Sequence, residues 1–392
     1  MSSHRTPLSI LDLAPIVSGG TARDALRNTI DLARRAEEFG YHRYWLAEHH
    51  FTPGVASSAP AVLIALVAAA TSRIRVGSGA VQLGHQTAAA VVEQFGTIDA
   101  LYPGRIDLGL GRSGQRRAEA LKELKDGAGA EPRHEEPRPA RDTHGLLIPP
   151  PFSFAHLLTS PRFALWASLL QQPGAQSPDF ADQVDDILAL LSGTYLSSEG
   201  LDAHAVPGEG ADVEVWILGS SGGQSAQVAA ERGLPFAANY HVSPSSVLEA
   251  VDAYRAAFKP SASLAAPYVV VSADAVVAAD DATARELASP YGLWVRSIRA
   301  GEGAIAFPSP REAAAHSWSE EDRLLVADRV DTQFVGAPAT VVEKLRVLRD
   351  ATGADELLVT TIAHDHADRV RSYELLAEAW DRAETERAAP PA

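Results

Sequence analysis

Short apolar runs alternate with amphipathic segments along almost the whole of this 392-residue chain. The apolar runs have the length of β-strands and lie at 8–13, 44–47, 74–83, 106–110, 213–218, 235–238, 268–272 and 356–361. Between most of them apolar residues recur with helical spacing, at 26–39, 88–101, 180–191, 224–232, 247–258, 341–351 and 373–383. Strands that alternate with helices are typical of an α/β fold with a parallel sheet and crossover helices. Eight such strands predict a (β/α)8 TIM barrel, although an open sheet has the same pattern.

Two segments interrupt this alternation. Residues 126–165, with a Pro-rich centre at 128–161, follow the fourth strand, and residues 300–319 precede the last helices. We interpret both as insertions in one barrel domain, because the alternation resumes after each. A long loop at this end of a barrel either serves the active site or lies in solvent. The first insertion is therefore a candidate lid with 149–152 as its ordered end, and the tail 385–392 is expected to be disordered.

Composition and charge exclude several classes of function. A net charge of −16, from 34 Lys+Arg and 50 Asp+Glu, disfavours nucleic acid and anionic membranes as partners. The chain has no cysteine, which excludes disulfides, thiolate metal sites and cysteine nucleophiles. No apolar signal-peptide core begins the chain, and no apolar run reaches the roughly 18 residues of a membrane span. These features predict a cytoplasmic protein without a membrane or nucleic-acid partner.

The most informative polar residues, Glu48, His49 and His50, directly follow the second strand. The C-terminal ends of barrel strands carry the active site, and imidazoles change charge near neutral pH. His49 and His50 are therefore candidate catalytic residues. Because neighbouring side chains on a strand diverge, both need not reach one ligand. The alternatives are a structural, hydrogen-bonded pair and a metal-dependent hydrolase, although no HxH or HxxxH pattern accompanies these two histidines.

Two more strand ends are rich in glycine. Gly79 and Ala80, at the end of the third run, leave room for a flat ring, although glycine in a strand also marks tight bends. Arg112 follows Gly111 at the end of the fourth strand. Its planar guanidinium suits a phosphate or a carbonyl, and the alternative is a solvated loop.

The fifth strand is followed by a Gly-Ser-Ser-Gly-Gly-Gln-Ser sequence at 219–225 and then by a helix. Backbone N–H groups at a helix N-terminus, together with serine hydroxyls, make a site for an anion. The sequence is neither a Walker A loop, since no lysine follows, nor a GxGxxG turn. It predicts a phosphate site, and the alternative is an N-cap serine with glycines that serve packing.

These motifs, in this order, resemble the bacterial luciferase-like flavin monooxygenase family. The resemblance extends to 104–112, 229–235 and 352–357. It implies a barrel that binds reduced FMN in its mouth, with Gly79 and Ala80 against the isoalloxazine. It is also compatible with a non-proline cis peptide between these two residues. It also implies that His49 is the catalytic histidine. The phosphate or ring edge would be contacted by Arg112, and the phosphate held by Ser220, Ser221, Gly222 and Ser225.

The resemblance implies a monooxygenase that uses O₂ and reduced FMN to oxygenate a small organic substrate. A separate flavin reductase would supply the reduced FMN, and the protein would be a homodimer. One alternative is an F420-dependent hydride-transfer oxidoreductase on the same barrel, and another is a protein that binds flavin without turnover. The luciferases proper carry a cysteine where this chain has Gly111, so light emission is not expected.

Overall fold

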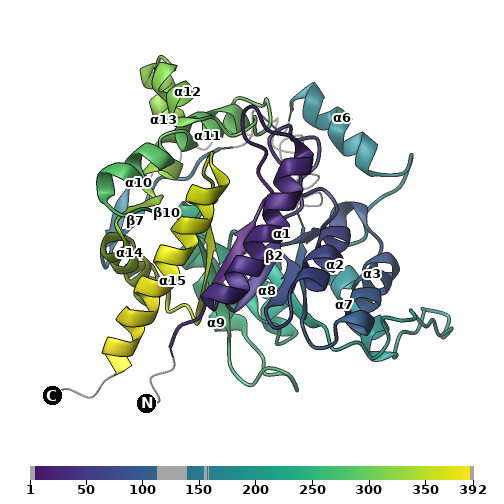
Figure 1. The fold of residues 1–392 in the computed structure, drawn as a ribbon. Helices are drawn as coiled ribbons and strands as arrows, with labels where there is room; N and C mark the ends of the chain where they lie inside the picture. Colours follow the sequence, from purple (N-terminus) through teal and green to yellow (C-terminus); the bar gives the residue numbers. More distant parts are fainter. Residues whose placement is uncertain (1–4, 113–138, 154–156, 158, 389–392) are drawn as a thin grey trace.

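A closed barrel of eight parallel strands forms the centre of the molecule (Figure 1). The computed structural model describes residues 5–112, 139–153, 157 and 159–388. The strand β1 pairs with both β2 and β12, and β9 pairs with β10, which closes the ring. The predicted TIM barrel is therefore confirmed. Its strands are β1 (Leu8–Asp12), β2 (Arg43–Leu46), β3 (Arg75–Ser78), β5 (Ile106–Gly111), β8 (Glu214–Gly219), β9 (Phe236–Asn239), β10 (Val269–Val277) and β12 (Glu356–Thr360).

Helices cover the outside of the barrel. They are α1 (Ala22–Phe39), α2 (Pro60–Ala70), α3 (Ala88–Leu101), α7 (Phe180–Ser192), α8 (Gln224–Glu231), α9 (Val247–Ala257), α14 (Pro338–Thr352) and α15 (His366–Ala388). The sequence sets several of their ends: a capping box between Thr21 and Asp24 begins α1, and Gly40 at φ 84° ends it. Within the described ranges, no helix is both long and apolar enough to cross a membrane.

Two apolar cores stabilise the barrel. The larger lies between the strands and the surrounding helices, where Ile10, Val76 and Leu108 are fully buried. The smaller fills the barrel interior, where the rings of Trp45 and Trp216 meet edge to face with centroids 5.1 Å apart. Burial of this kind supplies most of the favourable free energy of folding.

A buried ionic network closes the N-terminal end of the barrel. Arg43 Nη1 donates to Asp107 Oδ2 at 2.9 Å and to Glu214 Oε2 at 2.7 Å, and Arg43 Nε donates to Glu356 Oε2 at 3.3 Å. Arg75 Nε adds a 2.7 Å bond to Asp107 Oδ1. Burial alone would lower the pKa of Arg43, but the surrounding carboxylates hold it above its ordinary value. Every charge here therefore has a partner of opposite sign.

The first insertion is partly described. Residues 126–138, 154–156 and 158 of the predicted 126–165 segment lie outside the described residues. The rest contains an antiparallel hairpin, β6 (Arg141–Thr143) and β7 (Leu146–Ile148), and the start of α6 (Pro161–Leu170). Tyr240 Oη donates to the Leu147 carbonyl at 2.8 Å, which fixes the hairpin beside the end of β9. The ring of Phe152 lies 3.9 Å from the Arg299 guanidinium carbon.

The second interruption is larger than the sequence indicated. Between β10 and β11 (Phe334–Gly336) the chain forms α10 (Asp281–Ala288), α11 (Tyr291–Arg299), α12 (Pro310–Ala315) and α13 (Glu320–Asp331). The predicted insertion 300–319 includes only α12 of these. In Figure 1, α11, α12 and α13 lie at the end of the molecule opposite the two termini. Tyr291, Trp294 and Val326 pack onto the interior core, so α11 and α13 cover the C-terminal end of the barrel.

Three predicted boundaries were also wrong. The run 74–83 is split at Gly79 into β3 and β4 (Val81–Gln82), because β4 pairs further along β5. The run 268–272 continues to Val277, because its interrupting Asp274 is buried with a hydrogen-bond partner. The tail predicted at 385–392 is helical as far as Ala388, where α15 ends. This last part of α15 is held by Glu384, which is buried and accepts from Arg349 Nη1 at 2.8 Å.

Candidate active site

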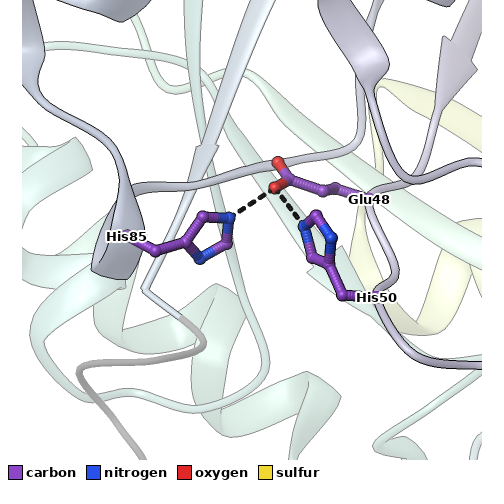
Figure 2. A group of neighbouring side chains, drawn as sticks. All are labelled: Glu48, His50 and His85. Atoms are coloured by element: carbon purple, nitrogen blue, oxygen red, sulfur yellow. Dashed lines mark hydrogen bonds and ion pairs between the residues drawn. The ribbon is translucent and has the colours of Figure 1, made fainter. Parts of the chain in front are cut away.

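The side chain of Glu48 organises the loop after β2 (Figure 2). Its Oε1 lies 2.8 Å from His50 Nε2 and 2.8 Å from His85 Nε2, and its Oε2 accepts from the Gln82 N–H at 2.9 Å. Burial raises the pKa of Glu48, but hydrogen bonds from His50, His85 and Gln82 outweigh it and lower the pKa to about 2. Because the carboxylate is ionised, both imidazoles donate to it. His85 belongs to the short 3-10 helix η1 (Leu83–His85).

The cluster of Glu48, His50 and His85 has metal-ligand chemistry, with candidate ligand atoms within 4.8 Å of one another. It is the only group of that kind in the described part of the chain. Both Nε2 atoms are used as donors to one carboxylate oxygen, so the geometry is that of a hydrogen-bonded cluster. His49 does not belong to it, and the structure does not bring His49 and His50 together as ligands of one ion.

His49 has a different environment from His50. Its backbone N–H donates to the Ser57 carbonyl at 2.8 Å, which fixes the chain, while its side chain is exposed. Although the residue is exposed, nearby protein atoms desolvate its ring. This desolvation lowers the pKa of His49 to about 4, whereas the charge of Glu48 acts to raise it. An imidazole with this pKa is neutral at pH 7 and can accept a proton. The expected divergence of the two neighbouring histidines is observed.

The predicted flavin shelf lies at the next strand end. The peptide between Gly79 and Ala80 is cis, and the Gly79 N–H donates to the Leu46 carbonyl of β2 at 2.8 Å. A Cβ at Gly79 would lie 2.7 Å from Leu11 Cδ1, so a larger residue would require the Leu11 side chain to move. A Cβ at Gly111, beside Arg112, would lie 3.2 Å from the Ala80 methyl group. The ends of β3 and β5, which are neighbouring strands of the barrel, are therefore in close contact here.

The predicted phosphate loop connects β8 to α8. The side chains of Ser220 and Ser221 are exposed, whereas that of Ser225 is buried within the first turn of α8. Ser246 Oγ donates to the Ser220 carbonyl and holds the loop against η3 (Pro244–Ser246). A Cβ at Gly222 would lie 3.0 Å from the Ala253 methyl group, so glycine allows this loop to pack on α9.

Arg112 lies near the same loop, because Asp179 interacts both with Arg112 and with the start of α8. The Arg112 charge contributes to lowering the pKa of Asp179, after the larger effect of a hydrogen bond from Gln224. Gln224 Nε2 lies 3.0 and 2.9 Å from the two carboxylate oxygens of Asp179. Arg112 after β5 and the serine loop after β8 are therefore neighbours across the adjacent pair of strands. Together they offer one cation, exposed hydroxyls and helix N–H groups to an anion.

A second polar cluster covers the opposite side of the barrel mouth. His241, just after β9, has Nδ1 2.6 Å from Ser272 Oγ of β10. Burial lowers the pKa of His241 to about 3, and the charges of Arg329 and His49 contribute. Asp274, also on β10, accepts from Gln333 Nε2 at 2.8 Å. Burial raises the pKa of Asp274 to about 6.

A groove of about 450 Å³ lies at the other end of the barrel, where Leu8, His42 and Ile74 begin or precede the strands. Arg5, Trp380 and other residues complete its lining. In TIM barrels chemistry occurs at the C-terminal ends of the strands and the N-terminal end serves stability. We therefore assign the active site to the mouth that contains His49 and His241.

The comparison with protein families shows which family this chain belongs to. A model of the family described as "Luciferase-like monooxygenase" matches residues 7–140 and 172–356, most of the chain. This protein is a luciferase-like monooxygenase family member. An uncharacterized Bacillus subtilis protein, YvbT, is 38% identical over 96% of this chain and 97% of its own length. An Escherichia coli luciferase-like monooxygenase is 35% identical over 96% and 97%.

Other relatives of this family member have more specific names. The N-acetyl-S-alkylcysteine monooxygenase of Bacillus subtilis is 53% identical over 27% of this chain and 32% of its own length. The crystal structure of apo-MsnO8 is 32% identical, covers 97% and 98% of the two chains, and has a TM-score of 0.73. An FMN complex of 3,6-diketocamphane monooxygenase from Pseudomonas putida, 20% identical, covers 96% and 97% with a TM-score of 0.61 and supports the fold alone.

Sequence reasoning missed several residues of this candidate site. His85 follows the glycine shelf and His241 follows the sixth strand, and both are polar residues directly after a strand run. That signal had identified Glu48 and His49, so the same rule applied to every strand end would have found them. Asp274 and Arg329 gave no comparable signal, because a charged residue inside an apolar run or a helix usually lies at the surface.

Proposed function

We propose that this protein is a flavin-dependent monooxygenase that oxygenates a small organic substrate with O₂ and reduced FMN. The overall reaction converts substrate, O₂ and reduced FMN into oxygenated substrate, water and oxidised FMN. A separate flavin reductase supplies the reduced FMN. The observation that supports this most directly is His49, an accessible and neutral imidazole at the mouth of a barrel of this family.

The residues at the mouth fit FMN. Gly79 and Ala80 are half-buried at the end of β3 and carry no bulky side chain, which suits a flat ring. The Ser220–Ser221 hydroxyls and the N-terminus of α8 suit a phosphate, since the helix dipole and free N–H groups favour an anion. Arg112 adds a positive charge in a chain whose net charge is −16. This arrangement offers ring and phosphate separate places on neighbouring strand ends.

The chain has three tasks in this reaction. Bound FMN supplies the oxygen chemistry. The serine loop and Arg112 orient the phosphate, which fixes the position of the ring in the mouth. His49 accepts or returns a proton at its imidazole, while Glu48 holds His50 and His85 in place beside it. The helices α11 and α13 cover the mouth and limit the access of water.

One relative suggests a first set of substrates. Its name, N-acetyl-S-alkylcysteine monooxygenase, specifies thioethers of N-acetylcysteine, and it shares 53% identity with this chain over 106 residues. We propose these thioethers as the first compounds to supply to this protein. The shared segment is a quarter of the chain, so a broader set of sulfides and ketones belongs in the same panel.

Reconstitution with each cofactor tests the proposal. The full chain is supplied with FMN, a flavin reductase and NADH, or with F420 in its reduced or its oxidised form, and O₂ uptake and products are measured with each substrate. Substrate-dependent O₂ uptake that yields an oxygenated product with FMN supports the proposal. Substrate reduction or oxidation with F420, without O₂ incorporation, shows the hydride-transfer alternative. Tight FMN binding with no turnover of any substrate indicates a flavin-binding protein.

A further inference from the structure

Arg329 differs from the other buried arginines of this protein. Among the described residues, five arginines are buried. Four of them contact a carboxylate within hydrogen-bond distance, as the pairs Arg43–Asp107, Arg299–Asp328, Arg349–Glu384 and Arg369–Asp12. Such pairing is the rule, because a buried guanidinium without a partner of opposite charge is costly. Arg329 is the exception.

The contacts of Arg329 leave most of its donors free. Its Nη2 donates to the Tyr291 hydroxyl at 2.7 Å. Its Nε is buried and has no hydrogen-bond partner. No carboxylate of the described residues lies within 4.0 Å of the guanidinium. Arg329 is only 9% exposed, and its Nε has no contact with solvent that could replace a partner.

Arg329 faces the barrel mouth. It lies near the C-terminal end of α13, which together with α11 covers the interior core. The Tyr291 hydroxyl accepts from Arg329 and also hydrogen-bonds to Asp274 of β10, which places the guanidinium beside this strand, and its charge also acts on His241 after β9. The same His241 also responds to the charge of His49. Arg329 and His49 are therefore on two sides of one site.

The surroundings of Arg329 are otherwise apolar. Tyr291, Trp294 and Val326 belong to the interior core, and the Arg329 guanidinium carbon lies 5.7 Å from the centre of the Tyr291 ring. The proposed phosphate site is elsewhere, on the loop after β8 with Arg112 after β5. An anion that reaches Arg329 would thus enter beside apolar side chains, on the β10 side of the mouth.

We propose that Arg329 binds a carboxylate of the substrate, and that the substrate is an anion with an apolar body. This inference rests on the proposed function. The planar guanidinium suits a carboxylate because two parallel hydrogen bonds fix its orientation. The position of the carboxylate at Arg329 would direct the rest of the substrate toward His49 across the mouth.

A purely structural role for Arg329 is the competing explanation. The hydroxyl of Tyr291 contacts both Arg329 and Asp274, so Asp274 can compensate the charge through Tyr291. In that case no external anion is needed, and the mouth would not distinguish a carboxylate from a neutral group of the same shape.

Binding of matched ligands to the full chain without flavin tests the proposal. Titration calorimetry compares benzoate with benzamide and 4-phenylbutyrate with 4-phenylbutanamide. We expect the wild type to bind at least one carboxylate tenfold or more tightly than its amide. Arg329→Met should remove this preference and Arg329→Lys should retain part of it. Arg323→Met removes an exposed cation from the same helix and should keep the full preference.

Equal binding of acid and amide by the wild type, including no binding of either, overturns the proposal. So does a carboxylate preference that survives in Arg329→Met. If FMN displaces the carboxylate, and Arg329→Met loses affinity for FMN, then Arg329 serves the cofactor and the proposal is wrong. The titrations involve neither flavin turnover nor O₂. Their failure leaves the proposed function standing, and failed turnover with an intact carboxylate preference affects only that function.

Discussion

The two ends of the barrel differ in whether their buried charges have partners of opposite sign. At the N-terminal end, Arg43 is bound by three carboxylates, and Arg75 shares two of them. At the C-terminal end, no carboxylate of the described residues lies within 4.0 Å of the Arg329 guanidinium, and His49 and His241 are kept neutral by desolvation. The same barrel thus has a satisfied end and an unsatisfied end.

The difference shows which end is available to a ligand. A network whose donors and acceptors are all used has nothing to offer a small molecule, and removing one member leaves the others buried without partners. Buried groups that lack partners destabilise the fold and remain available for binding or proton transfer. Unpaired groups at the mouth are therefore evidence for function, whereas charge density alone is not.

The largest effect is expected at the mouth. His49→Ala should lower turnover by roughly 10²- to 10⁴-fold, because a positioned acid or base contributes that much. FMN affinity should change by only a few-fold, since the phosphate and ring sites lie elsewhere. Steady-state O₂ uptake and FMN titration measure the two quantities. His50→Ala is the matched variant, and wild-type turnover in His49→Ala would contradict the assignment.

At the N-terminal end of the barrel, a free-energy effect of comparable size is expected on stability rather than on activity. Arg43→Met leaves Asp107, Glu214 and Glu356 without their shared cation, which should cost about 3–5 kcal/mol of unfolding free energy. Urea denaturation measures it. Arg35→Met, on the exposed face of α1 where Arg35 pairs with Glu38, should cost less than about 1 kcal/mol. Equal losses in the two variants would show that the buried network has no special role.

The barrel itself was predictable from the sequence because its signal is local. All eight apolar runs became barrel strands, and the helix expected at 88–101 has those bounds in the structure. The helices α10, α11 and α13 were missed, although Asp280 and Ser319 cap two of them. The apolar residues of α11 and α13 pack on the interior core at the end of the barrel, and α10 packs on β11, so the β/α alternation does not anticipate these helices.

The candidate site could be predicted from the sequence only where its residues directly follow a strand. His49, the Gly79–Ala80 shelf and the serine loop each follow a strand and can be recognised by that position alone. The link between His85 and Glu48, and that of Arg329 to His241, depend on segments that meet only when the barrel closes. Burial of Asp274 is likewise a tertiary effect, since its neighbours Gln333 and Tyr291 come from distant segments.

The titration of Asp274 tests whether its environment is as unfavourable to charge as the structure indicates. Its folded pKa is about 6, raised by burial above the ordinary value of 3.8. The folded state therefore holds this proton more tightly than the unfolded state, and Asp274 lowers the stability as pH rises from about 4 to 6. Asp274→Asn cannot ionise. Relative to wild type, the variant should gain about 1–3 kcal/mol between pH 4 and pH 8.

Thermal or urea unfolding of both proteins at pH 4, 6 and 8 measures this difference. His49 and His241 have lowered folded pKa values, so they act in the opposite direction and destabilise the protein as pH falls. Their contribution is common to the two proteins and cancels in the comparison. A stability difference that stays constant with pH would mean that Asp274 is ionised throughout.

The smallest effect is expected at the phosphate loop, which is polar like the N-terminal network but open to solvent. Ser221 is exposed, so Ser221→Asp should fold normally while placing a carboxylate beside the proposed phosphate position. At close range in a solvated site, such repulsion should weaken FMN about tenfold, or about 1.4 kcal/mol. Riboflavin has no phosphate and should bind within twofold of wild type. Ser263→Asp makes the same change at an exposed serine before β10, at the other end of the barrel, and should affect neither ligand. Equal weakening of FMN and riboflavin by Ser221→Asp would place the phosphate away from this loop.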